Sequence, residues 1–392
     1  MLQLSYVNFR KDSYILVEGK AENDRFYIIQ SGRVLCQKEI SVGDSQTFLG
    51  PGDFIGVIPC MSTHKQIETV IAVTDVVAIS VLRDQYPALI EKNTPVAMKI
   101  IRTFANRMRT LNETLTQLTL KNTLVSSPEQ MFSIAAYYEK MGKINLAVYG
   151  YYQYLRSCPH GNDVAKAKSR FVALKEKSKA VYFEPTTELM RVYPKDTMIF
   201  SECQTGQDMF IIQEGQVKIS KVVDGNEVIL AVLKKGDFFG EMALLENKPR
   251  SASAIAHDEC RLMVINVKNF NLMVETQPQL VSRLTTTLAE RLWAMHRQLA
   301  NTQLRDPVFK LLDMLALQLE KNRTPVTKGT SYQFDLTPYD LAHMCGIPQE
   351  EQVIAIGTFI KDPKVRLIGG KIFISDCEEL LKSADFHRRA SH

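Results

Sequence analysis

The sequence contains two copies of one pattern, and this internal repeat limits the folds that the chain can adopt. Residues 14–34 (YILVEGKAENDRFYIIQSGRV) match residues 198–217 (MIFSECQTGQDMFIIQEGQV), and the Gly-Asp-Phe triplets that begin at Gly52 and Gly236 lie 184 positions apart. Both copies consist of short alternating strands separated by Gly, Asp and Asn, which is typical of a sandwich or jelly roll. The sequence therefore predicts two β jelly-roll domains, copy one (residues 1–120) and copy two (residues 183–304).

The length and composition indicate a multidomain protein of mixed α and β class. A chain of 392 residues is too long for one ordinary core, and 45% hydrophobic and 23% charged residues are typical of globular proteins. The net charge of +5 neither requires nor excludes a nucleic-acid partner. No apolar run is long enough to cross a bilayer, and the first residues lack the layout of a signal peptide. The 7 cysteines are scattered without a C-x-x-C pair, which favours a reducing cytoplasm over a disulfide framework, a zinc site or an iron–sulfur cluster.

Each copy is predicted to end in a long amphipathic helix. Apolar residues recur every three or four positions, at Leu111, Leu115 and Leu118 in copy one and at Leu284, Leu288, Leu292, Met295 and Leu299 in copy two. Because such stripes are longer than one face of a small β domain, a helix–helix contact in a homodimer is one interpretation. Packing of each stripe on its own domain is the other, and the sequence leaves both open.

An α-helical spacer is predicted between the copies, over residues 121–182. One helix carries Ala135, Ala136 and Tyr138, a Met-Gly-Lys turn follows, and a second helix spans residues 147–155 before a Pro-His-Gly break and a third helix. Small residues at the crossing, with aromatic residues around them, resemble a tetratricopeptide-type helix pair. One such repeat cannot bury its own face alone. The segment is therefore either a simple spacer or a platform for a protein partner.

An acid and a base lie close together in residues 238–254, FFGEMALLENKPRSASA. Glu241 and Arg250 could form a structural ion pair, but Gly240 allows a ligand to approach the backbone. Small residues flank the arginine and leave space beside it, namely Pro249, Ser251 and Ala252. A turn with free amide donors and one guanidinium is suited to a phosphate, and a carboxylate is suited to a sugar hydroxyl. A group that carries both is a nucleotide.

This stretch resembles the phosphate-binding cassette of cyclic-nucleotide-binding domains, FGE-x-AL followed by PR-[SAT]-A. The resemblance implies that Arg250 and Ser251 hold the cyclic phosphate and that Glu241 holds the ribose 2′-hydroxyl. Gly240 and the amides of Met242 and Ala243 would complete the site, beside Ala252. A residue pair on the closing helix covers the base in this family. Aligning that helix places Met295 and His296 there, with Trp293 adjacent, whereas the catabolite-activator type has small hydroxyl residues at this point.

Copy one lacks both of the ligand-holding side chains. With the same spacing of ten residues after the glycine, Val57 corresponds to Glu241 and Gln66 to Arg250. A phosphate there would lose its hydration without gaining a compensating charge. We therefore expect copy one not to bind a cyclic mononucleotide in the usual way. It would be a structural or dimerising module, with a different ligand as the alternative.

The C-terminal segment, residues 305–392, is predicted to be a winged helix-turn-helix domain. Asp306 and Pro307 form a helix start, and a later helix, a turn at Cys345–Gly346, another helix and two strands about Gly369–Gly370 complete the pattern. The order of β domain, long helix and winged helix resembles bacterial transcription regulators of the catabolite activator and Fnr type. The resemblance covers copy two and the C-terminal segment, and residues 1–180 are additional.

The predicted recognition helix departs from that family. Its arginines, which read guanine edges in the family, are replaced by Gln349 and Ile354, and Glu351 adds an acid. Residues 305–392 contain twelve Lys or Arg and twelve Asp or Glu, which is no electrostatic footprint for DNA. Residues that could still contact double-stranded DNA are Gln349, Glu350, Lys361, Lys364, Arg366 and Lys371. The alternative is a winged helix that binds protein.

No catalytic motif of a hydrolase, kinase or metalloenzyme is present, so the sequence predicts a binding protein rather than an enzyme. The leading hypothesis is a cytoplasmic bacterial sensor that binds a cyclic nucleotide, with cAMP as the expected ligand, in copy two and regulates transcription as a homodimer. The alternative is a cyclic-nucleotide-responsive signalling scaffold that does not bind DNA and whose ligand could be a cyclic dinucleotide. Neither hypothesis involves a metal or a membrane.

Overall fold

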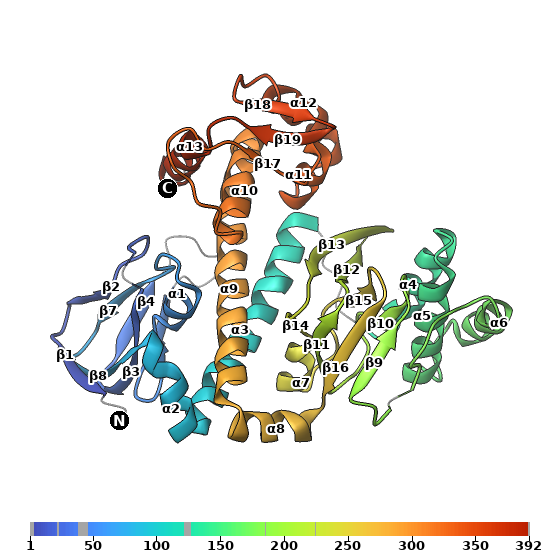
Figure 1. The fold of residues 1–392 in the computed structure, drawn as a ribbon, viewed down its shortest axis with the longest axis horizontal. Helices are drawn as coiled ribbons and strands as arrows, with labels where there is room; N and C mark the ends of the chain where they lie inside the picture. The colour runs from blue at the N-terminus through green and yellow to red at the C-terminus, as the bar shows by residue number, and fades with distance from the viewer. Residues whose placement is uncertain are drawn as a thin grey trace. The chain divides into compact units, whose positions relative to one another are not determined.

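The structure is a computed structural model that describes residues 4–21, 23–37, 46–120, 127–184, 186–223 and 225–390. Figure 1 labels the helices and strands of the chain. By its internal contacts the chain divides into two compact units. Unit 1 comprises Met1–Leu89, Thr110–Lys121 and Leu288–His392. Unit 2 comprises Ile90–Arg109 and Asn122–Thr287. Each unit thus takes one β domain and parts of both long helices.

Copy one forms a β roll of two four-stranded antiparallel sheets in unit 1. The sheets have the orders β1-β8-β3-β6 and β2-β7-β4-β5. Alternate residues of these strands, such as Ile29, Val34, Val70 and Ala78, face each other in a core from which water is excluded. The elements are β1 (Ser5–Phe9), β2 (Tyr14–Leu16), β3 (Arg25–Ser31), β4 (Val34–Gln37), β5 (Gln46–Leu49), β6 (Phe54–Ile55), α1 (Val57–Ser62), β7 (Thr69–Ala72), β8 (Val76–Leu82), the 3-10 turn Arg83–Gln85 and α2 (Tyr86–Lys92).

Copy two repeats this topology in unit 2. Its sheets have the orders β14-β11-β16-β9 and β10-β15-β12-β13, which match copy one strand for strand. The elements are β9 (Met190–Tyr193), β10 (Met198–Phe200), β11 (Met209–Glu214), β12 (Val217–Val223), β13 (Asn226–Leu233), β14 (Phe238–Phe239), α7 (Glu241–Glu246), β15 (Ser253–Ala256), β16 (Cys260–Ile265) and α8 (Val267–Thr276). The prediction of two copies of one β domain is confirmed.

Two long helices follow the β rolls, α3 (Thr94–Leu120) after copy one and α9 (Pro278–Gln303) after copy two. The first part of each helix belongs to unit 2 and the second part to unit 1. The predicted apolar stripe of α9 is buried at Leu284, Leu288 and Leu292, whereas Leu118 near the end of α3 is 39% exposed. Each helix therefore shares a unit with the β roll that it does not directly follow.

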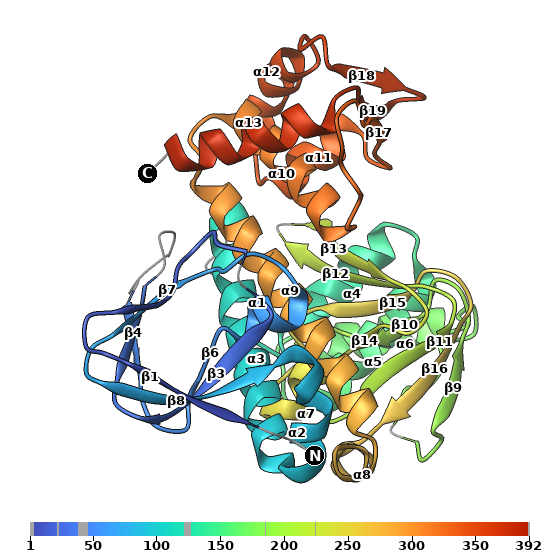
Figure 2. The same cartoon turned by 60° about the vertical axis from the view of Figure 1, so that its left-hand side comes forward.

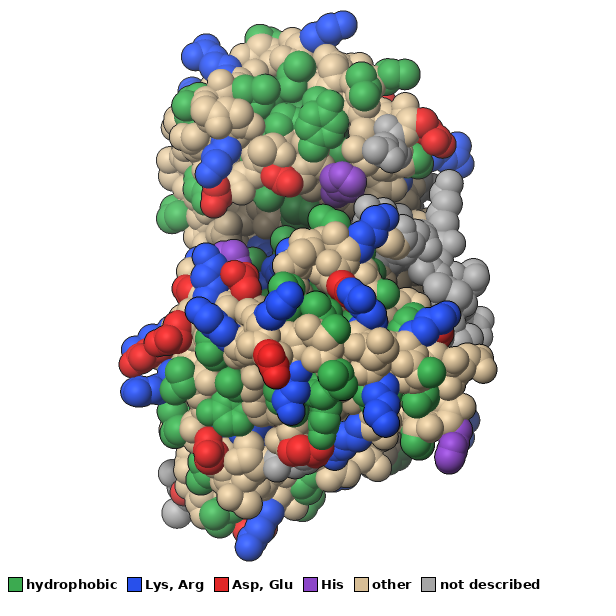
Figure 3. Space-filling view, turned by 90° about the vertical axis from the view of Figure 1, so that its right-hand side faces the viewer, with side chains coloured by type: hydrophobic (Ala, Val, Ile, Leu, Met, Phe, Trp, Pro, Cys, Tyr) green, Lys and Arg blue, Asp and Glu red, His purple; other side chains and the backbone are tan. Residues whose placement is uncertain are grey.

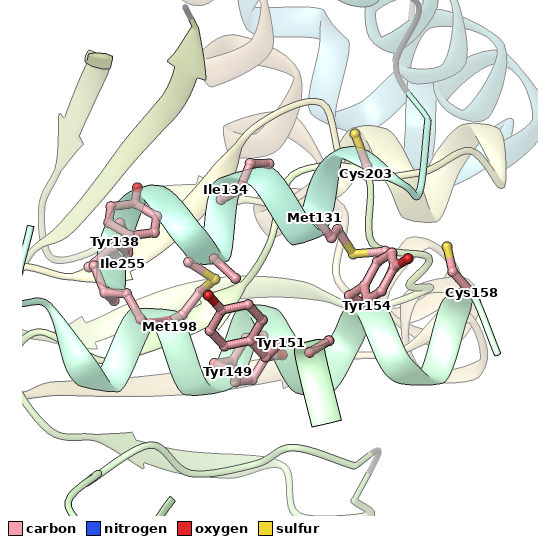
Figure 4. Close-up of a cluster of buried hydrophobic side chains, with 14 residues drawn as sticks. Met131, Ile134, Tyr138, Tyr149, Tyr151, Tyr154, Cys158, Met198, Cys203 and Ile255 are labelled. Atoms are coloured by element: carbon pink, nitrogen blue, oxygen red, sulfur yellow. The ribbon is translucent and has the colours of Figure 1, made fainter. Parts of the chain in front are cut away.

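Three helices, α4 (Gln130–Lys140), α5 (Ile144–Ser157) and α6 (Val164–Lys175), occupy the predicted spacer in unit 2. A Cβ atom on Gly150 of α5 would lie 2.9 Å from the Cβ of Ala135 of α4, so the absent side chain allows these helices to approach closely. Their buried tyrosines form one core with Met198, Cys203 and Ile255 of copy two (Figure 4). The helices are thus packed on copy two, and their assignment to the tetratricopeptide type stays a prediction.

The C-terminal segment of unit 1 combines four helices with a small sheet of order β17-β19-β18 (Figure 2). As predicted, Asp306 caps α10, because its carboxylate accepts a hydrogen bond from the Val308 amide (2.7 Å) and Pro307 is the first helical residue. The elements are α10 (Pro307–Lys321), β17 (Tyr332–Gln333), α11 (Pro338–Met344), α12 (Gln349–Phe359), β18 (Val365–Ile368), β19 (Lys371–Ile374) and α13 (Cys377–Ala390). The winged-helix assignment stays a prediction.

Candidate nucleotide site

Two glycines make room for a guanidinium in copy two. Gly240 precedes α7 with φ +78°, a left-handed conformation that favours glycine. A Cβ atom at this position would lie 2.7 Å from Nη1 of Arg250, and one at Gly206 would lie 2.8 Å from Nη2. Side chains at either position would therefore displace the arginine.

Arg250 is a buried cation with one unfilled hydrogen-bond donor. Its residue is 6% exposed, its Nη1 donates to the Gly240 carbonyl (2.7 Å), and its guanidinium lies 4.2 Å from the ring centroid of Phe200. The Nε atom is buried and has no hydrogen-bond partner in the described part of the chain. Burial lowers the pKa of Arg250 to about 10, so it remains charged at neutral pH. A buried cation with a donor to spare is suited to an anion.

The other predicted cassette residues surround this arginine. Glu241, Met242, Ala243 and Ala252 are all buried. The negative charges of Asp208 and, more weakly, of Glu241 oppose the effect of burial on the pKa of Arg250. Ser251 is half-buried and its hydroxyl lies 3.9 Å from the Met242 sulfur. The sequence-predicted cluster from Gly240 to Ala252 is thus brought together in one place.

The same backbone arrangement occurs in copy one without the charge. Gly56 precedes α1 with φ +75°. The Gln66 amide donates to the Lys20 carbonyl (2.8 Å), just as the Arg250 amide donates to the Gln204 carbonyl (2.9 Å). All six residues of α1 are buried and none is charged. Gln66 therefore occupies the place of the arginine.

A second arginine, which the sequence reasoning missed, contacts the cassette of copy two. Arg109 lies on α3, after copy one, but forms an ion pair with Glu246 at the end of α7 and donates from Nη1 to the Pro249 carbonyl (3.3 Å). Both side chains are largely buried, with 11% and 4% exposed, and Nη2 of Arg109 has no hydrogen-bond partner in the described structure. The helix of one copy thus contributes to the cassette of the other.

Trp293 makes the equivalent contact from α9. It stacks on His64, in the cassette-like segment of copy one, with the ring centroids 3.5 Å apart and the planes at 11°. Arg109 and Trp293 lie 184 positions apart, which is also the separation of Gly56 and Gly240. This shared offset was the signal in the sequence that could have revealed Arg109. The two copies exchange corresponding residues of their closing helices.

The residues predicted to cover the base lie on the second part of α9. Met295 and His296 are half-buried in unit 1, whereas the cassette belongs to unit 2. Their placement over a bound base therefore stays a prediction.

Comparison with known proteins identifies the two β rolls. A family model described as the cyclic nucleotide-binding domain matches residues 6–93 and 190–277. The chain contains two cyclic nucleotide-binding domains. These ranges fall within copy one and copy two, so the domain with the charged cassette and the domain without it match the same family model.

The chain is similar to regulators of the CRP family. The CRP-like cAMP-activated global transcriptional regulator of Mycobacterium tuberculosis is 27% identical over 193 residues, which are 49% of this chain and 86% of the regulator. The cAMP-activated global transcriptional regulator CRP of Pasteurella multocida is 29% identical over 160 residues, 40% of this chain and 76% of the regulator. Among solved structures, the EAL enzyme Bd1971 is 36% identical, but the match covers 26% of this chain and 94% of that chain, with a TM-score of 0.23.

The predicted DNA-contacting residues lie on and after α12. The exposed surface of this helix includes two large apolar residues, Val353 (66% exposed) and Ile354 (74% exposed), beside the exposed acids Glu350 and Glu351. The side chain of Gln349 lies outside the described residues. This surface is apolar and acidic rather than basic.

The basic residues that follow α12 are partly neutralised. Lys364 pairs with Glu379, and Lys371 pairs with Asp335. Lys361 and Arg366 are exposed. Only part of the predicted basic set is therefore available for phosphates.

The described residues include no group of three or more His, Cys, Asp or Glu side chains that could hold a metal ion. All seven cysteines are buried and none is in a disulfide. None of the helices in the described ranges is both long and apolar enough to cross a membrane.

Proposed function

We propose that copy two binds a cyclic nucleotide, with cAMP as the expected ligand. Arg250 and Ser251 would hold the cyclic phosphate, Glu241 the ribose 2′-hydroxyl, and the backbone at Gly240, Met242 and Ala243 the remaining oxygens, with Ala252 leaving room beside them. The observation that carries this proposal is the buried Arg250, whose Nε lacks a hydrogen-bond partner among the described residues. The names of the M. tuberculosis and P. multocida relatives, both cAMP-activated, support the choice of ligand.

In this proposal the closing helix α9 responds to the ligand. Met295 and His296 would cover the base, and Trp293 would hold α9 on copy one through His64. The ligand changes the arrangement of α9 only if it binds two arrangements with unequal affinity. Copy one, which has Val57 and Gln66 in place of the acid and the base, would not take a cyclic mononucleotide.

Calorimetric titration tests the ligand site directly. The intact protein should bind one cyclic mononucleotide per chain in a comparison of cAMP, cGMP, cyclic di-AMP and cyclic di-GMP. Arg250→Ala should leave the phosphate unpaired and weaken binding by about 2–5 kcal/mol. The matched control is Gln66→Ala, the same change at the corresponding position of copy one, which should leave binding unchanged. Equal effects of the two substitutions would overturn the site assignment.

The output of this sensor is proposed to be transcription regulation in the bacterial cytoplasm, through binding of the C-terminal segment to double-stranded DNA. The CRP-family relatives support this reading. Residues Lys361 and Arg366 are exposed and could contact phosphates.

A second candidate output is binding to protein, without DNA. It is favoured by Val353 and Ile354, because exposed apolar side chains on a helix are typical of a protein interface and contribute little to binding phosphates. A gel shift with genomic fragments, with and without cAMP, distinguishes the two outputs. Binding to DNA should weaken steeply with salt, whereas binding of an apolar protein partner should depend on salt only slightly.

The helices α4, α5 and α6 provide a further candidate surface for a protein partner. Residues of these helices line an open pocket of about 580 Å³, among them Phe132, Tyr151, Ala165 and Arg170. Exposed basic side chains lie on α6, including Lys166, Lys168 and Lys175, and Figure 3 shows numerous Lys and Arg side chains on this side of the molecule. A homodimer, predicted from the helical stripes, is part of the same proposal.

A further inference from the structure

The backbone of Arg250 is fixed by one turn of copy two. The Arg250 amide donates to the Gln204 carbonyl (2.9 Å), and the Arg250 carbonyl accepts from the Cys203 amide (2.9 Å). The Gln204 side chain closes this turn, because its Oε1 accepts from the Ser201 amide (2.9 Å). The position of the buried guanidinium therefore depends on the turn Ser201–Gln204.

The turn is in contact with the helices that precede copy two. The Tyr149 hydroxyl of α5 donates to the Ile199 carbonyl (3.1 Å), and the side-chain amide of Gln204 lies 3.4 Å from the same hydroxyl. The Cys203 thiol donates to Oε1 of Gln130 (3.3 Å), at the start of α4. Both helices thus contact the turn that holds Arg250.

The helices are anchored to copy two at a second place, which restricts their movement. Glu227 of β13 pairs with Lys143 (3.1 Å) and accepts from the Tyr138 hydroxyl (3.1 Å). Tyr149 is 2% exposed, and Figure 4 shows its ring within the tyrosine cluster of α4 and α5. A buried tyrosine on an anchored helix holds a fixed position.

We propose that α4 and α5 are a working part of the nucleotide site, in which Tyr149 is a positioning residue that fixes Arg250 through the turn Ser201–Gln204. This inference rests on the proposed function of copy two. The segment is then neither a passive spacer nor only a platform for partners, because the hydroxyl of Tyr149, through the turn Ser201–Gln204, affects the affinity for the cyclic phosphate. Tyr149 itself does not contact the ligand.

The test is Tyr149→Phe, which removes the hydroxyl and keeps the ring. The affinity for cAMP should fall by about 3- to 10-fold, as expected for one lost hydrogen bond. The matched control is Tyr151→Phe on the same helix, a residue with the same 2% exposure, whose hydroxyl donates to Glu139 (2.7 Å) within the helical segment. The control should leave affinity unchanged. Equal affinities of the two variants would overturn the inference.

Two further readouts separate positioning from a general loss of stability. Replacing one non-bridging phosphate oxygen of cAMP with sulfur should weaken binding less in Tyr149→Phe than in the wild type, because the misplaced Arg250 no longer discriminates between the two atoms. Without ligand, amide hydrogen exchange at Cys203 and Arg250 should be faster in Tyr149→Phe alone. Unchanged exchange at these two amides would overturn the inference.

Hydrogen exchange also distinguishes failure of this inference from failure of the proposed function. If the wild-type protein bound no cyclic nucleotide, faster exchange in Tyr149→Phe would still support the positioning of Arg250, and the proposed function alone would fail. If the protein bound cAMP and Tyr149→Phe changed the exchange but not the affinity, the inference would fail and the proposed function would stand.

Discussion

Copy one and copy two have the same strand order and the same glycine at the start of the cassette helix, yet among the described residues only the cassette of copy two contains a buried cation, Arg250. Gln66 and Arg250 make corresponding backbone hydrogen bonds. The β roll, the left-handed glycine and the short helix therefore form without the charge. This difference indicates that the fold does not require the arginine. A residue whose role is to bind a ligand is expected to be dispensable for the fold in this way.

The comparison extends to the closing helices. Corresponding positions on α3 and α9 contact the cassette segment of the opposite copy, but Arg109 does so through an ion pair and Trp293 through a ring stack. Each contact lies in a different compact unit. The two closing-helix contacts and the two cassette glycines can each be disturbed separately.

The largest effect, on the free energy of unfolding, is expected for Arg109→Ala. The substitution leaves the buried carboxylate of Glu246 without its cation, which should lower the free energy of unfolding by about 3–5 kcal/mol. Chemical denaturation with hydrogen exchange as the probe of unit 2 measures this decrease in the free energy of unfolding. The double variant Arg109→Met with Glu246→Leu removes both charges and should recover most of it. A loss below about 1 kcal/mol for Arg109→Ala would mean that solvent screens the pair.

A smaller effect is expected when the two cassette glycines are replaced. Gly240→Ala and Gly56→Ala both place a side chain in a left-handed conformation, at a cost of about 1–2 kcal/mol each. The new methyl group meets Nη1 of Arg250 in copy two but the flexible end of Leu16 in copy one. Calorimetric titration should therefore show weaker cAMP binding for Gly240→Ala only. Weaker binding in both variants would contradict the assignment of the site to copy two.

The smallest effect is expected from pH, through His64. Burial, with weaker contributions from Arg323 and Arg297, lowers the pKa of His64 to about 4 from the usual 6.5. Between these values the unfolded chain binds a proton that the folded chain does not, so stability falls as pH decreases from about 6.5 to about 4. Partial exposure of the ring limits the loss to about 1–2 kcal/mol.

The single tryptophan makes this titration visible. Trp293 is stacked on His64, so its fluorescence should change with a midpoint near pH 4 in the folded protein. His64→Gln should abolish the change, whereas substitution of His160, which lies in the other unit, should not. A midpoint near 6.5 would show that the ring is hydrated rather than stacked.

The parts of the molecule that were predictable depend on local spacing. The offset between the Gly-Asp-Phe triplets predicted two β rolls, because strand and turn preferences act over a few residues. The spacing of ten positions between Gly240 and Arg250 likewise specifies one local backbone path. The cap at Asp306 was predictable for the same reason, since the residue and its partner Val308 are two positions apart.

The parts that were missed depend on contacts between distant segments. Arg109 and Glu246 lie 137 positions apart, and nothing in the helical stripe of α3 distinguishes this arginine from a solvated one. Tyr149 has the pattern of an ordinary core tyrosine, so its contact with Gln204 could not be inferred. The loss of arginines on α12 was visible in the sequence, but the exposure of Val353 and Ile354 depends on how the helix packs.

The uncharged cassette of copy one has a consequence for the shape of the response. With one proposed ligand site per chain and closing-helix contacts supplied from the chain's own two copies, a homodimer whose two sites are uncoupled should bind ligand with a Hill coefficient of one. Occupancy would then rise from one tenth to nine tenths over a roughly 80-fold range of ligand concentration, without a threshold. Such a protein would respond gradually to a second messenger over a wide range of its concentration. A protein with two coupled sites would respond over a narrower range.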